Sequence, residues 1–179
     1  MSRLFAAILP DDPFRDALET LAGGAVTLAG GGKVTPRENF HLTLAFLGET
    51  SRQEAALEGL MAVEIPAFSL ELGQGGFFPG HRGNTLWQGV KPCPSLAALQ
   101  RQLWSELTRR GFSLEDRPFL PHFTLARGSG GKYFSSPPPS ALPSLKVSSV
   151  WLMESIFTGS GVRYRPMGQR QLNHNLHQQ

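Results

Sequence analysis

Two segments of this chain carry the same pattern, and that repetition constrains the fold more than any other feature. The first, Phe40-His-Leu-Thr-Leu-Ala-Phe-Leu-Gly48, contains His41 and Thr43. The second, Pro121-His-Phe-Thr-Leu-Ala-Arg127, repeats the order His-x-Thr-Leu-Ala 81 residues later (122 − 41). About one helix-strand-strand-helix unit lies between the two. The repetition therefore predicts two similar halves that face each other.

Each segment is expected to form a β-strand, in which residues i and i+2 point to the same face. His41 and Thr43 should then share one face of the first strand. His122 and Thr124 should share one face of the second. The same rule assigns apolar side chains to the opposite faces, namely Leu42, Leu44, Phe46, Phe123 and Leu125.

Histidine serves several purposes in proteins, and three of them fit this pattern poorly: metal binding, nucleophilic catalysis and a purely structural role. Metal sites usually add carboxylates or further histidines, and neither motif has an acidic neighbour on its strand face. No Ser-His-Asp or Cys-His grouping surrounds either histidine. Two structural histidines, buried and bonded to backbone, remain possible for one motif alone, but the repetition argues against them. His174 and His177 are scattered in a polar C-terminal segment that we interpret as a frayed tail.

The paired histidines and hydroxyls suit phosphoryl hydrolysis by general acid and base. One imidazole would take a proton from water while the other donates a proton to the leaving oxygen, in line across phosphorus. Histidine serves both roles because its ordinary pKa of about 6.5 lets either form exist near neutrality. The threonine hydroxyls could bond the non-bridging oxygens. This scheme requires no metal and no other cofactor.

Composition bounds the class of protein without naming a substrate. The chain has 179 residues, of which 40% are apolar and 17% charged, so it can bury a substantial core. Its net charge of +3 is compatible with a phosphate-bearing partner. The single cysteine, Cys93, excludes an internal disulfide. The six-residue apolar run near the N-terminus is too short for a signal peptide or membrane span. We therefore expect a soluble, cytoplasmic protein without membrane contact.

The order of elements predicts an α+β fold with antiparallel sheets, because strands and helices mix without regular β-α alternation. Strands are expected at 4–9, 40–48, 68–72, 85–90, 118–126 and 146–153, with a terminal hairpin turning at 159–161. Helices are expected over 14–22, stopped by Gly23-Gly24, from a Ser51-x-x-Glu54 capping box onward, and from Pro94 to Gly111. Residues 24–33, 73–83 and 128–143 are expected to be loops.

Beyond the two motifs, further stretches resemble a known family. His41-Leu-Thr-Leu and His122-Phe-Thr-Leu are similar to the paired His-x-Thr-x tetrapeptides of the 2H phosphoesterases. The other stretches resemble the bacterial RNA 2',3'-cyclic phosphodiesterases, also called 2'-5' RNA ligases. They are Leu4-Phe-Ala-Ala-Ile-Leu-Pro10, the run Glu38 to Glu49, Arg117-Pro-Phe-Leu-Pro-His122 and Arg163-Tyr-Arg-Pro166. This resemblance spans nearly the whole chain.

The resemblance implies one bilobal domain over residues 1–179, with two antiparallel sheets facing a central cleft and helices on the outer faces. It also implies hydrolysis of a terminal 2',3'-cyclic phosphate on RNA to a 2'-phosphate, with slow reversible 2'-5' joining in some members. By matching positions, His41 would protonate the leaving 3'-oxygen and His122 would activate water. Thr43 and Thr124 would hold the phosphate. The residues alone do not distinguish the two histidine roles.

Three further residues are candidates for substrate binding. Arg127 could neutralise phosphate charge, although strand alternation places it opposite His122 unless the strand ends there. Phe46 could stack a base, although alternation assigns it to the core. Tyr164 could line the cleft, by resemblance only.

Two other functions stay open at this point. A binding module could hold RNA ends or nucleotides without turning them over, and a related enzyme could act on small cyclic nucleotides or 2'-5'-linked oligonucleotides. Intact histidines and threonines in both motifs favour an enzyme. We expect RNA ends or nucleotides bearing a 2',3'-cyclic phosphate as partners. We also expect a monomer with no obligate protein partner.

Overall fold

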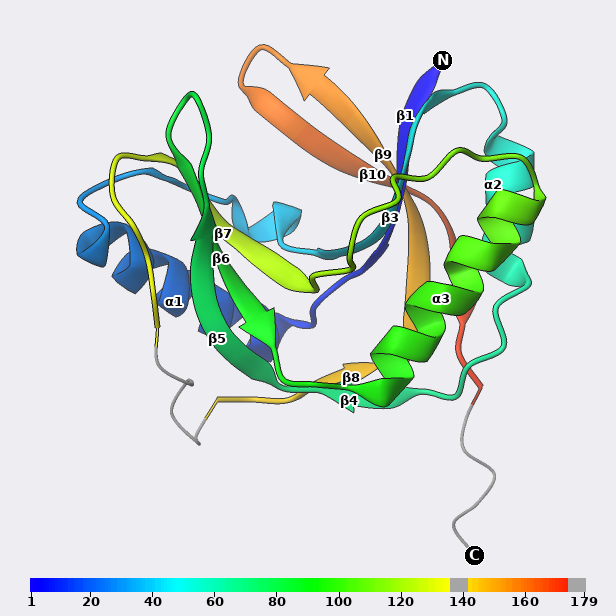
Figure 1. Ribbon diagram of the computed structural model, residues 1–179, viewed down its shortest axis with the longest axis horizontal. Helices are drawn as coiled ribbons and strands as arrows, with labels where there is room; N and C mark the ends of the chain where they lie inside the picture. The colour runs from blue at the N-terminus through cyan, green and yellow to red at the C-terminus, as the bar shows by residue number, and fades with distance from the viewer. Residues whose placement is uncertain (136–141, 174–179) are drawn as a thin grey trace, which may run out of the picture.

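The computed structural model describes residues 1–135 and 142–173 and contains three α-helices within those ranges (Figure 1). The helices are α1 (Asp12–Leu28), α2 (Gln53–Met61) and α3 (Pro94–Arg109), with a 3-10 turn, η1 (Arg37–Asn39). The strands are β1 (Ser2–Ile8), β2 (Lys33–Val34), β3 (Leu42–Thr50), β4 (Phe68–Leu70), β5 (Leu72–Phe78), β6 (Asn84–Val90), β7 (His122–Ser129), β8 (Leu145–Val147), β9 (Ser149–Thr158) and β10 (Gly161–Gln171).

The predicted α+β class with antiparallel sheets is confirmed. Most strands form one sheet in the order β10-β9-β1-β3-β7-β6-β5, with β2 paired to β7, while β4 and β8 form a separate pair. We call β10-β9-β1-β3 the first half-sheet and β7-β6-β5 the second. The half-sheets are joined through the pairing of Leu42 with Phe123. The two His-x-Thr strands, β3 and β7, therefore lie next to each other at this junction.

Helices α1 and α3 are exchanged between the halves, whereas α2 packs on β9 and β10 of its own half-sheet. Helix α1 follows β1 of the first half-sheet but packs on β7 of the second, where the rings of Phe14 and Phe123 lie 5.3 Å apart. Helix α3 follows β6 of the second half-sheet but packs on β3 of the first and on α2. Figure 1 shows α1 on one side of the molecule and the α2–α3 pair on the other. Each half-sheet is thus covered by a helix that the opposite half supplies.

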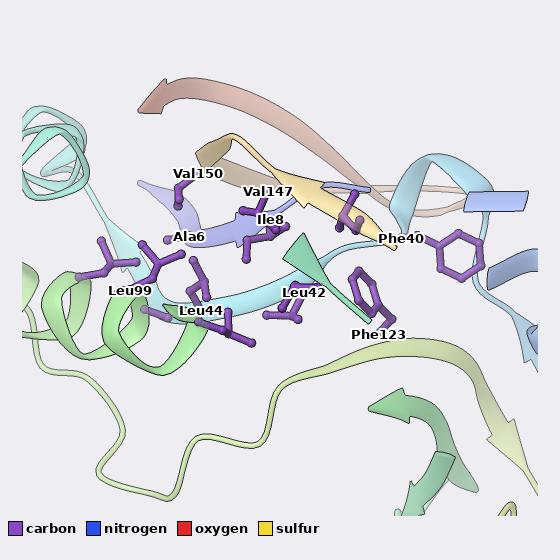
Figure 2. Packing of buried hydrophobic residues seen from close by; sticks show 14 of the residues in the cluster. Ala6, Ile8, Phe40, Leu42, Leu44, Leu99, Phe123, Val147 and Val150 are labelled. Atoms are coloured by element: carbon purple, nitrogen blue, oxygen red, sulfur yellow. The ribbon is translucent and has the colours of Figure 1, made fainter. Parts of the chain in front are cut away.

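The main core is one cluster that runs through both half-sheets and the helices packed on them. Leu42 and Leu44 of β3 are buried, as are Ala6 and Ile8 of β1 and Leu99 of α3. Figure 2 shows these side chains gathered in one cluster. The apolar face predicted for the first motif strand is therefore correct as far as Leu44.

Strand β3 contains a bulge just after its motif. Thr43 pairs with Ala7 and Ala45 pairs with Ala6, so Leu44 is an extra residue between two consecutive partners. An extra residue reverses the alternation of the side chains that follow it, here as far as a second extra residue at Leu47.

Strand β7 contains a bulge at the equivalent position. Thr124 pairs with Trp87 and Ala126 pairs with Leu86, which leaves Leu125 as the extra residue. The predicted similarity of the two halves thus extends from the motif to the local irregularity of the backbone.

The first predicted helix boundary is wrong. Helix α1 runs through Gly23 and Gly24 to Leu28, so the expected loop over 24–33 is partly helical. A Cβ atom at either glycine would meet nothing within 4 Å. The chain reverses instead at Gly30-Gly31-Gly32, where all three residues have positive φ. Glycine tolerates a helix interior at modest cost when packing on one helix face compensates for it.

The predicted capping box at Ser51 and Glu54 is also wrong. The residue before α2 is Arg52, whose side chain does not cap the helix. Its guanidinium instead donates to the carbonyl oxygens of Arg110 and Gly111 at the end of α3. The start of α2 is therefore fixed by a tertiary contact rather than by a local capping motif.

The loop predicted over 73–83 is a third error, since most of it belongs to β5. Its glycines serve close packing: a Cβ atom on Gly76 would lie 2.5 Å from the ring of Trp87. The predictions for α3, which ends before Gly111, and for the hairpin of β9 and β10 are confirmed. In the loop expected over 128–143, Ser129 still belongs to β7 and residues 136–141 lie outside the described part, as do His174 and His177.

Candidate active site

His41 immediately precedes β3, and its ring is held by the chain just before it. Its Nδ1 lies 2.7 Å from the carbonyl oxygen of Asn39. Asn39 is buried, and its side-chain amide donates to the carbonyl oxygen of Val162 at 3.0 Å. Strand β10 therefore fixes Asn39, which in turn fixes the imidazole.

His122 opens β7 and is held in the same way. Its Nδ1 lies 2.7 Å from the carbonyl oxygen of Leu120, two residues earlier. A carbonyl oxygen can only accept, so Nδ1 of each histidine carries the proton and donates it. In the neutral ring Nε2 then has a free lone pair. Both imidazoles are thus preset with Nε2 available for proton transfer.

Burial disfavours the charged form of both rings. It lowers the pKa of His41 to about 4, with smaller contributions from the positive charges of Arg127 and His122. Burial also lowers the pKa of His122, helped by Arg127 and Arg117. Both rings are therefore neutral at pH 7 in the unliganded protein, and a bound phosphate anion would favour their protonation.

Aromatic rings surround each histidine, and sequence patterns alone did not reveal most of them. The ring centroids of Phe5 and Tyr164 lie 5.0 and 4.8 Å from that of His41. Those of Phe78 and Trp87 lie 5.1 and 6.0 Å from that of His122. These rings desolvate the imidazoles and restrict their rotation.

Tyr164 lines the His41-side cavity, as the resemblance suggested, and its ring also lies against that of His41. Burial raises the pKa of its hydroxyl, so the phenol stays protonated at neutral pH.

The bulges in β3 and β7 correct two predictions based on strict alternation. Phe46 was assigned to the core, but its side chain is 54% exposed and lines the same cavity as Thr43. Arg127 was placed opposite His122, but it lines that cavity together with Thr124. Both residues follow a motif histidine by five positions. The paired bulges therefore turn one aromatic ring and one guanidinium into the cleft.

Two cavities flank Thr124 and Arg127, which line both. The larger, of about 410 Å³, lies on the His122 side and also contacts Thr43. The smaller, of about 180 Å³, lies on the His41 side. The structure thus brings both motifs, Arg127, Phe46 and Tyr164 to one connected region between the half-sheets.

Residues that the sequence analysis did not single out also line these cavities. They include Lys33, Asn39, Trp104, Arg117 and Phe119. Local signals could have found three of them, because Asn39 lies two residues before His41, and Arg117 and Phe119 lie five and three residues before His122. Lys33 and Trp104 reach the cleft from distant elements, which no single-strand pattern reports.

Within residues 1–135 and 142–173, no three His, Cys, Asp or Glu side chains are grouped so that they could hold a metal ion. None of the described helices is both long and apolar enough to cross a membrane.

Comparison with known proteins agrees with this fold and these motifs. Residues 10–152 match the family described as the 2'-5' RNA ligase superfamily. The chain belongs to that superfamily, which confirms the resemblance inferred from the paired motifs.

Individual relatives carry a more specific description. A protein of Escherichia coli (strain K12) called RNA 2',3'-cyclic phosphodiesterase is 35% identical over 139 residues, covering 76% of this chain and 77% of the relative. A protein of the same description from Aeropyrum pernix is 35% identical over 146 residues, covering 75% and 83%. The crystal structure of E. coli LigT complexed with 3'-AMP superposes with a TM-score of 0.84 at 30% identity, covering 96% and 98% of the chains.

Proposed function

We propose that this protein is an RNA 2',3'-cyclic phosphodiesterase that opens a terminal cyclic phosphate to a 2'-phosphate. The observation that carries the proposal is the matched pair of histidines. Each has its Nδ1 bonded to a backbone carbonyl at 2.7 Å, and each lies beside a threonine in the region between the half-sheets. The description of the relatives from E. coli and Aeropyrum pernix supports the choice of substrate.

In the proposed reaction, water attacks phosphorus in line with the bond to the 3'-oxygen. Nε2 of His122 accepts a proton from the water as the new P–O bond forms. Nε2 of protonated His41 donates its proton to the 3'-oxygen as that P–O bond breaks. The product carries a 2'-phosphate and a 3'-hydroxyl, and proton exchange with solvent restores the two rings.

The other cleft residues stabilise charge on phosphorus. Thr43 and Thr124 donate their hydroxyl protons to the non-bridging oxygens, and Arg127 neutralises the charge that increases in the transition state. No step of this scheme uses a metal ion. Attack by an RNA 5'-hydroxyl in place of water would give weak 2'-5' joining by the same groups.

We further propose that the protein acts as a monomer, because one chain supplies both motifs and both cavities. Light scattering at the assay concentration would test this. Its cytoplasmic location stays a prediction from the sequence.

Turnover of a short RNA ending in a 2',3'-cyclic phosphate, measured in EDTA with the product position resolved, tests the proposal. A 2'-phosphate product is expected, and H41A and H122A should each lower turnover by about 10² or more. Loss of activity in EDTA would contradict the metal-independent scheme. Binding without turnover would favour a binding module. Near-normal rates in both folded histidine variants would refute the mechanism.

A further inference from the structure

The two cavities beside Arg127 differ in chemical character. Of the described residues that line the His41-side cavity, none is acidic, and the fully charged ones are Lys33 and Arg127. These two face each other as partners in the β2–β7 pairing. Hydroxyls of Thr35 and Ser160 line the same space. The cavity therefore suits an anion that can bond to several donors.

The His122-side cavity is larger and is lined by more aromatic side chains, together with the charged residues Glu115 and Arg117. Phe46 of β3 and Trp104 of α3 line it with partly exposed rings, and Phe119 and Leu120 add further apolar surface. At about 410 Å³ it far exceeds the space that a single water occupies, which is about 30 Å³. Aromatic walls of this kind stack nucleobases.

The connectivity of ribose relates these two cavities to the reaction. The leaving 3'-oxygen lies at the His41 end of the in-line axis, and its carbon, C3', is bonded to C4', which leads through C5' to the preceding phosphate. The 2'-oxygen lies off that axis, and C2' is bonded to C1', which carries the base. In this orientation the 5' side of the ribose, which carries the preceding phosphate, points toward His41. The C1' side, which carries the base, points away from His41.

We propose that the His41-side cavity is a binding site for the phosphodiester that precedes the terminal nucleotide, with Lys33 as its principal ligand. The terminal base then occupies the aromatic His122-side cavity. This inference rests on the proposed function and adds a direction to it: the RNA strand enters past β2 and the β9–β10 turn. A substrate with a preceding phosphate should be preferred over a single nucleotide.

Three substrates and two variants test this proposal. The substrates are a nucleoside 2',3'-cyclic phosphate, a dinucleotide with the same cyclic end, and that dinucleotide with a neutral methylphosphonate linkage. The variants are K33Q and, as a matched control, K146Q on β8, which lines neither cavity. Thermal melting confirms that both variants fold.

The wild-type protein should prefer the charged dinucleotide over the mononucleotide by about fivefold in kcat/KM, as one exposed ion pair can provide. K33Q should remove that preference and leave the mononucleotide rate within about twofold, whereas K146Q should change neither. In the wild type, kcat/KM for the methylphosphonate dinucleotide should equal the value that K33Q shows for the charged dinucleotide.

Other outcomes separate this inference from the proposed function. Equal losses on all three substrates in K33Q, or an unchanged preference, would overturn the phosphate site while leaving the phosphodiesterase intact. Absence of turnover on every substrate by the wild type would instead overturn the proposed function.

Discussion

The ring of Tyr164 stands edge-on against the imidazole of His41, with 4.8 Å between ring centroids and 78° between ring planes. Tyr164 comes from β10 and His41 from the start of β3, and Phe5 of β1 contacts both rings. This contact keeps one face of the imidazole dry and is part of the burial that lowers the pKa of His41.

Truncation of Tyr164 should therefore raise the pKa of His41. In the wild type, nuclear magnetic resonance titration should give a value of about 4 for His41. In Y164A water reaches the ring, so the pKa should move toward its ordinary value of about 6.5. Y164F keeps the ring contact and should titrate like the wild type. Equal pKa values in all three proteins would show that Tyr164 does not shield His41.

Stability should depend on pH because of the same burial. The pKa of His41 is lower in the folded than in the unfolded protein, so the unfolded state binds more protons between pH 4 and 6.5. The free energy of unfolding should rise with pH across that window, with at most about 3 kcal/mol from His41. His122 contributes in the same direction. Urea unfolding of H41Q should show a flatter rise, and an equally steep one would contradict the argument.

The pH dependence of turnover should differ between kcat/KM and kcat. The profile of kcat/KM reports the pKa values of the free enzyme, and burial lowers them for both His41 and His122. Its maximum is therefore expected below pH 6.5. A bound phosphate anion raises both pKa values, so the maximum of kcat should lie at higher pH. A kcat/KM maximum at or above that of kcat would oppose this assignment.

The threonine hydroxyls should matter less than the imidazoles. T43V and T124V keep the side-chain shape but remove the donors to the phosphate, so each should lower kcat/KM about tenfold. T108V, on an exposed position of α3 that lines neither cavity, is the matched control. A loss in either motif variant as large as in H41A would mean that the hydroxyl has a further role.

Two glycine substitutions should change stability in opposite directions. Gly24→Ala lies inside α1 with open space around the added methyl, so it should stabilise the protein by about 0.5–1 kcal/mol. Gly76→Ala would press on Trp87, which packs beside His122, and should cost about 1–3 kcal/mol and lower turnover. Chemical denaturation measures both, and a destabilised G24A would contradict the continuous helix.

The sequence predicted what depends on repetition and periodicity. The paired motifs located β3 and β7, and the leucine spacing of α3 located its helix, because these signals involve residues close together in the chain. The burial of Leu42 and Phe123 follows from the same strand alternation.

Alternation could not predict Phe46 and Arg127. Counting by twos assumes an unbroken strand, and one extra residue at Leu44 or Leu125 reverses the side chains that follow it, up to the next irregularity of the strand. The positions of Lys33 and Trp104 depend on pairing and helix packing between distant segments. They became apparent only from the assembled fold.

The position of β1 between β3 and β9 has a consequence for biosynthesis. Residues 3–7 of β1 pair with 151–155 of β9, so the first half-sheet closes only after β9 has been made. Strand β10, which anchors Asn39 and delivers Tyr164, comes later still. A nascent chain on the ribosome, or one terminated early, therefore contains both histidines but lacks the support that aligns His41. The support of His41 is therefore complete only once β10 has been made.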